Sequence, residues 1–91
     1  MFQLSIADFL GKGDYFMAVY TDIIKELRKD KGITQSDMAK HFNIKQSMYS
    51  MYESGARTMK LEMLCTIADV LGTSTDYLLG RTAQSNPYPK R

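Results

Sequence analysis

The chain has 91 residues, of which 44% are hydrophobic and 24% charged, and its formal net charge is +2. This length supports one hydrophobic core, and the composition is ordinary for a single globular domain. No apolar run approaches the roughly 18 residues of a membrane span, and the start MFQLSIADFL lacks the basic region of a secretion signal, so we expect a cytoplasmic protein without membrane contact.

The first sixteen residues differ in pattern from the remainder of the chain. Ser5, with Asp8 three residues later, fits the cap of a short helix near residues 9–10, and Gly11-Lys12-Gly13 then interrupts it. We interpret residues 1–16 as an N-terminal extension, either from an upstream start or from cloning. We expect its apolar side chains to pack back on the domain in preference to a dimer contact.

An amphipathic helix is expected next, from about residue 14 or 20 to residue 31. Apolar residues recur at helical spacing in Tyr20, Ile23, Ile24 and Leu27, and Gly32 ends the segment. The charges of this helix mostly form its solvated face. Over the longer stretch from residue 22 to residue 60, lysine and arginine outnumber aspartate and glutamate. This excess is a weak electrostatic sign of a nucleic-acid partner.

A second, short helix is expected to open at Thr34. Asp37, three residues later, completes a pattern typical of a capping box. Met38, Ala39 and Phe42 supply the inner face. Asn43 then ends the helix, because Asn tolerates the left-handed conformation of a sharp turn, and Ile44 is expected to fill the turn.

The third helix, from about residue 45 or 46 to residue 53 or 54, has an unusual distribution of side chains. At about 100° per residue, one arc of roughly 140° carries small polar and amide groups and one methionine: Gln46, Ser47, Ser50, Met51 and Ser54. Met48, Tyr49 and Tyr52 fall on the opposite side. A helix that buries aromatic residues and exposes such an arc has a reading surface, so we predict a DNA recognition helix.

A fourth helix is expected over about residues 60–71, with its inner face formed by Leu61, Leu64, Cys65, Ala68 and Leu71. Ser74 or Thr73 is expected to cap a last short helix that ends at Gly80. Residues 81–91 are polar and rich in proline, which predicts a flexible basic tail. The predicted fold is all-α: a compact bundle of five short helices over residues 17–80, with a central helix-turn-helix, plus the extension.

Three segments resemble one known family. IIKELRKDKGITQSDMAKHFNI, QSMYSMYESGAR and LCTIADVLGTSTDYLLGRT occur in this order and spacing. Together they are similar to the lambda-repressor-like helix-turn-helix domains of the Cro/cI type, the XRE family. The likeness covers about residues 20–81, and the order of its motifs makes it specific.

The resemblance implies roles for individual residues. Gln35, at the start of the second helix, would contact a DNA phosphate. Gln46 and Ser47 would face base edges in the major groove, with Ser50 and Met51 one turn further along. Gln suits this task because its amide bonds adenine at two positions.

The resemblance also implies a salt bridge between Arg28 and Glu53, which would join the first and third helices. Two departures from the family pattern are visible. Met59-Lys60 stands where many relatives have Pro-Ser, so Thr58 is the expected cap of the fourth helix, and Tyr49 replaces the usual aliphatic residue. From charge alone, we expect Lys45, Arg57 and Lys60 to neutralise phosphates.

Other sites have little support. His41 is the only histidine and Cys65 the only cysteine, so we expect no metal site, no cofactor and no disulfide. Cys65 lies in an apolar pattern and is expected in the core. Ser50 has no base and acid arranged around it, and we therefore predict that the protein is not an enzyme.

The sequence predicts a sequence-specific binder of double-stranded DNA, a transcriptional regulator and repressor of phage or prophage type. It would bind a palindromic operator as a homodimer. The alternative is an antitoxin or small regulator that acts through protein–protein interaction. A methionine-rich surface motivates this alternative, formed by Met48, Met51, Met59 and Met63.

Overall fold

Five α-helices succeed one another in the computed structural model, which describes residues 13–89. They are α2 (Gly13–Asp30), α3 (Gln35–His41), α4 (Gln46–Glu53), α5 (Leu61–Leu71) and α6 (Thr75–Leu78). No strand occurs among these residues, and the all-α fold class is confirmed. The short helix predicted near residues 9–10 lies outside the described residues.

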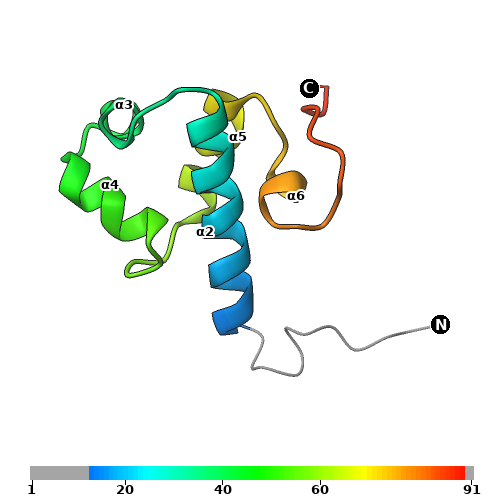
Figure 1. The fold of residues 1–91 in the computed structure, drawn as a ribbon, viewed down its shortest axis with the longest axis horizontal. Coiled ribbons are helices and arrows are strands. Elements are labelled where there is room, and N and C mark those ends of the chain that lie inside the picture. Colours follow the sequence, from blue (N-terminus) through cyan, green and yellow to red (C-terminus); the bar gives the residue numbers. More distant parts are fainter. Residues whose placement is uncertain (1–12, 90–91) are drawn as a thin grey trace.

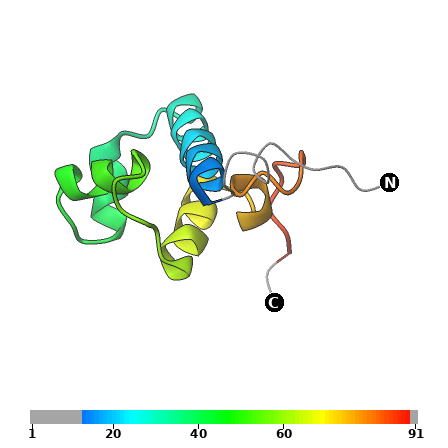
Figure 2. The same ribbon diagram turned by 90° about the horizontal axis from the view of Figure 1, so that it is seen from below.

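The long helix α2 runs through the middle of the molecule (Figures 1 and 2). Helices α3 and α4 lie on one side of it, and α6 with the C-terminal segment lies on the other side. Helix α5 packs against both α2 and α6. The predicted recognition helix is therefore separated from the C-terminal segment by the body of the domain.

Helix α2 begins at Gly13, close to the earlier of the two expected starts. It is continuous across residues 16 and 17, where the sequence predicted the boundary between extension and domain. Within it, Tyr20 and Ile24 are buried, in keeping with the amphipathic pattern. The helix ends before Gly32, whose φ of 70° is a left-handed conformation that favours glycine.

The capping box predicted at Thr34 is confirmed. The Thr34 hydroxyl accepts a hydrogen bond from the backbone N–H of Asp37 at 3.0 Å, and the Asp37 carboxylate accepts one from the backbone N–H of Thr34 at 3.0 Å. The bond from the Thr34 backbone, followed by the bond from its side chain, lowers the pKa of Asp37. Two backbone donors that α3 leaves unpaired are thereby satisfied.

The turn between α3 and α4 depends on Asn43, which has a φ of 54° and is the only residue other than glycine with positive φ in the described part. The backbone N–H of Ile44 returns to the Ala39 carbonyl at 3.2 Å, and the half-buried Ile44 side chain packs against the core. The left-handed turn predicted at Asn43 is thus confirmed.

The fully buried side chains come from every helix. The largest are Ile24, Met38, Tyr49, Ile67, Leu71 and Leu78. One core therefore holds α3 and α4 in a defined orientation against α2, α5 and α6.

The inner face predicted for α5 is partly wrong. Cys65 is exposed and Leu61 is 73% exposed, whereas Ile67 is fully buried. At about 100° per residue, Cys65 lies far from Leu64 around the helix, while Ile67 lies within about 60° of it on the other side. The buried stripe is therefore centred on Leu64, Ile67 and Leu71.

The capping prediction at Thr58 is also wrong. Helix α5 begins at Leu61, and its N-cap residue is Lys60, whose side chain makes no capping hydrogen bond. Thr58 is exposed and two residues too early. By contrast, Ser74 caps α6, since its hydroxyl accepts a hydrogen bond from the Tyr77 backbone N–H at 3.0 Å.

Residues 81–89 form no regular secondary structure but contact the domain. The Thr73 hydroxyl donates to the Ser85 carbonyl at 2.7 Å, and the Tyr88 hydroxyl donates to the Asp76 carboxylate at 3.0 Å. These bonds place the segment against α6, far from α3 and α4.

Replacing Thr34 by Ala should lower the free energy of unfolding by about 1 kcal/mol, because the capping hydrogen bond is lost. Thr58→Ala removes the same atoms at a position without a cap and should change stability by less than about 0.5 kcal/mol. Urea denaturation of both variants checks this. Equal costs for the two substitutions would contradict the assignment of the cap.

Candidate nucleic-acid interface

The site is built around the carboxylate of Glu53, at the end of α4. Glu53 is only 4% exposed, and Arg28 of α2 is 8% exposed. The Arg28 guanidinium donates to this carboxylate through Nε and Nη2, each at 2.9 Å. Its Nη1 atom donates to the Ile33 carbonyl at 2.8 Å. The structure thus brings together the two residues for which the resemblance implied a salt bridge.

Two further side chains donate to the same carboxylate. The Tyr49 hydroxyl, one turn earlier on α4, lies 2.8 Å from Glu53 Oε2. The Gln35 Nε2 atom, at the start of α3, lies 3.2 Å from Glu53 Oε1. One buried carboxylate therefore links α2, α3 and α4.

The protonation states of this cluster depend on its hydrogen bonds. Burial alone would raise the pKa of Glu53, but the donors Arg28, Tyr49 and Gln35 outweigh it and lower that pKa. The bond to Glu53 raises the pKa of Arg28 against the effect of its burial. Burial, then the bond to Glu53, raises the pKa of Tyr49. At neutral pH, Glu53 is therefore ionised while Arg28 and Tyr49 keep their protons.

The ionised carboxylate determines how the next amide is oriented. Glu53 has no proton to donate, so Gln35 must turn its N–H toward it. The Gln35 carbonyl oxygen then faces α4, where it accepts a hydrogen bond from Gln46 Nε2 at 2.8 Å. The Oε1 atom and second N–H of Gln46 have no hydrogen-bond partner among residues 20–89. Gln46 is thus held in place with one acceptor and one donor available.

Three of the four side chains predicted to point outward from α4 are exposed. Gln46, Ser47 and Met51 are exposed, and Ser50 is half-buried. We call these four residues the reading face. Tyr49, on the opposite side, is fully buried, whereas Met48 and Tyr52, on the flank away from Gln46, are half-buried.

The basic residues predicted to meet phosphates flank the reading face. Lys45, Arg57 and Lys60 are all exposed. Lys45 is the N-cap residue of α4, and the Arg57 backbone N–H donates to the Met51 carbonyl at 3.1 Å, which holds the loop after α4 close to the helix.

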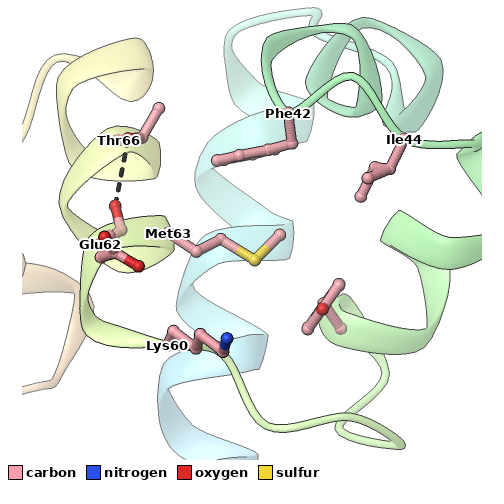
Figure 3. A pocket seen from close by; sticks show the side chains of 7 residues that line it. Phe42, Ile44, Lys60, Glu62, Met63 and Thr66 are labelled. Atoms are coloured by element: carbon pink, nitrogen blue, oxygen red, sulfur yellow. Dashed lines mark hydrogen bonds between the residues drawn. The ribbon is translucent and has the colours of Figure 1, made fainter.

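Lys60 lies beside a hollow between the turn before α4 and helix α5. Figure 3 shows Phe42 and Ile44 on one side of this hollow and Met63 and Lys60 on the other. Its volume is about 380 Å³. Lys60 therefore belongs to the flank of the domain beside α4 and not to the reading face itself.

The methionine-rich surface predicted from the sequence is smaller than expected. Met59 is 8% exposed and belongs to the core, which corrects its assignment to the surface. Met48 and Met63 are half-buried, and Met51 is 38% exposed. Met59 is buried because it comes after the loop that returns the chain to α5, where it joins the core cluster.

Sequence reasoning missed three contacts of the site: Tyr49 with Glu53, Gln35 with Glu53, and Gln35 with Gln46. The i, i+4 spacing of Tyr49 and Glu53 on one helix was a usable signal for their hydrogen bond. The two contacts of Gln35, with Glu53 and with Gln46, had no local signal, because they depend on how α3 and α4 cross.

Two other kinds of site have no basis in the described part of the chain. Within residues 20–89, whose side chains the structure describes, no three histidine, cysteine, aspartate or glutamate side chains gather as metal ligands. None of the helices described is both long and apolar enough to span a membrane.

Helices α3 and α4 are joined by a tight turn, and α4 has an exposed polar face and a buried ion pair to α2. This arrangement defines a domain of the helix-turn-helix class. The family described as helix-turn-helix matches residues 24–78, and the chain belongs to this family, of the XRE (Cro/cI) type. Membership indicates a domain of the DNA-binding helix-turn-helix type.

The relatives of the chain include several regulators of Bacillus subtilis (strain 168). The HTH-type transcriptional regulator AnsR is 41% identical over 69 residues, which cover 76% of this chain and 60% of AnsR. The SPbeta prophage-derived uncharacterized HTH-type transcriptional regulator YonR is 34% identical, covering 70% of this chain and 59% of YonR. The HTH-type transcriptional regulator ImmR is 36% identical, covering 64% of this chain and 46% of ImmR.

The chain spans about half to three fifths of the length of these relatives. No solved structure gives a significant match. The comparisons therefore establish the family of the domain.

Tyr49→Phe should lower the free energy of unfolding by about 1.5–3 kcal/mol, because a buried hydrogen bond to a charged group is lost while the ring remains. Tyr52→Phe is the matched control: no hydrogen bond of its hydroxyl occurs among residues 13–89, and its cost should stay below about 0.5 kcal/mol. Urea denaturation measures both. Equal costs would show that the Tyr49 hydroxyl does not stabilise the carboxylate.

Glu53→Gln should lower the free energy of unfolding at pH 7 by about 3–5 kcal/mol, because Arg28 is left as an unpaired buried charge. The lowered pKa of Glu53 means that its stabilisation is complete above the unfolded value of about 4.3 and is lost as the pH falls through the folded value.

The stability difference between wild type and Glu53→Gln should therefore shrink below about pH 4. Asp37, whose pKa is also lowered, is present in both proteins and cancels in this difference. Denaturation from pH 7 to pH 3 measures the effect, and a difference that stays constant would contradict it.

Proposed function

We propose that the chain binds double-stranded DNA sequence-specifically, with α4 in the major groove, and regulates transcription. The proposal depends mainly on the position of the Gln46 amide. It is exposed at the start of α4 and held by Gln35, which is itself held by the buried Glu53.

The free groups of Gln46 match one base. Its Oε1 atom accepts from adenine N6, and its second N–H donates to adenine N7 in the major groove. The restraint from Gln35 lowers the entropy that the side chain loses on binding. Ser47 and Ser50 are short enough to let the helix approach the base edges closely, and either hydroxyl bonds a base or a phosphate.

Contacts with the DNA backbone would come from around α4. Gln35 uses one N–H for Glu53 and its carbonyl for Gln46, which leaves a second N–H for a phosphate. Lys45, Arg57 and Lys60 are exposed and would neutralise phosphates on either side of the groove. These contacts position the helix without reading sequence.

We propose further that the protein acts as a dimer on a two-fold symmetric operator, as a repressor of phage or prophage type. One recognition helix covers only a few base pairs, and two copies about 34–36 Å apart supply the missing specificity. The similarity to YonR, which is named as prophage-derived, supports the phage type.

The test is a selection of binding sites from a random duplex pool at near-physiological salt. We expect a two-fold symmetric consensus and an affinity that falls steeply as salt rises. Gln46→Ala should weaken binding to the selected duplex by about 1–3 kcal/mol while leaving binding to random duplex unchanged. The matched control is Gln84→Ala, an exposed glutamine in the C-terminal segment on the far side of α2, and it should bind as wild type does.

Equal binding of selected and random duplexes by the wild-type protein would contradict the proposal. That outcome would favour the alternative, in which the main partner is another protein.

A further inference from the structure

An apolar hollow adjoins the reading face. It is lined by Ile44, Lys45, Ser47, Met48 and Met51, and its volume is about 370 Å³. Ile44 and Met48 are half-buried, while Met51 is 38% exposed. The hollow therefore brings apolar surface to the part of α4 that carries the reading face.

The position of the hollow is a consequence of the helix itself. Tyr49 and Glu53 point into the interior, so at about 100° per residue Ser47 and Met51 point most directly outward. Gln46 lies on the flank toward α3, where it bonds Gln35, and Met48 lies on the other flank. The reading face thus has a polar side and an apolar side, with Ser47 between them.

The major groove offers one apolar group that fits such a surface. Among the base edges exposed there, only thymine carries a methyl group, at C5. Methionine is flexible and polarisable, and it fills irregular gaps around small apolar groups. Lys45 at the rim places a positive charge where the DNA backbone would pass.

We propose that Ile44, Met48 and Met51 bind the 5-methyl group of a thymine next to the base pair read by Gln46. This inference rests on the proposed function. The hollow shares Ser47 and Met51 with the reading face, so an occupant other than the DNA would block the groove-reading surface. Met51 is therefore a specificity-determining residue, and each half-site carries a required thymine.

The test uses the selected duplex with each thymine replaced in turn by deoxyuridine, which lacks only the methyl group. Wild type should lose about fourfold in affinity at one position of each half-site, the value expected for one buried methyl group. At that position, cytosine should bind more weakly than 5-methylcytosine by a similar factor. The affinity ratio is internal to each protein, so a change in folded fraction does not alter it.

The variants Met51→Ala and Met48→Ala should reduce the ratio between thymine and deoxyuridine toward one. Met63→Ala, a half-buried methionine on α5 outside the reading face, is the control and should keep the wild-type ratio.

Sequence-specific binding with no effect of deoxyuridine at any position would overturn this inference and leave the proposed function intact. A deoxyuridine effect that persists in both methionine variants would also overturn it, because the methyl group would then be read elsewhere. If the wild-type protein selected no preferred duplex, the proposed function itself would be contradicted.

Discussion

One buried negative charge, the carboxylate of Glu53, holds the three helices of the site in register. It accepts hydrogen bonds from Arg28 on α2, Tyr49 on α4 and Gln35 on α3. A buried carboxylate without partners is very costly, so the fold must keep all three donors in place. The crossing of α3 and α4 and their position against α2 are therefore determined by polar geometry as well as by apolar packing around Tyr49.

The ion pair contributes orientation in addition to stability. Well-packed apolar residues often replace a buried ion pair without loss of stability, but they would not orient Gln35. Because Glu53 accepts only, the Gln35 amide has one orientation, and its oxygen then restrains Gln46. The buried carboxylate thus determines the orientation of Gln35, and Gln35 in turn restrains Gln46 at the surface of α4. This arrangement explains how an 8-residue helix presents a preorganised side chain.

The outward surface of α4 has a polar side and an apolar side. The polar side carries Gln46, and the apolar side carries Met51 above the hollow with Ile44 and Met48. Ser47, between them, is small enough to keep both sides accessible to a groove. In the proposed complex, a polar amide beside an apolar hollow would distinguish more base-pair patterns than either surface alone. The exposed Lys45, Arg57 and Lys60 would add affinity without sequence preference.

The amino-acid sequence alone was sufficient for the features that depend on neighbouring residues: the capping box at Thr34, the left-handed turn at Asn43, the bounds of α4 and its outward face. Local hydrogen bonds and backbone preferences decide these. Tertiary packing was needed to select which stripe of α5 is buried. The helix carries apolar side chains on more than one face, and its contacts with the neighbouring helices decide that Ile67 and not Cys65 is buried. Packing also produced the contact between Gln35 and Gln46, since residues on two helices meet only when the core sets the angle at which those helices cross.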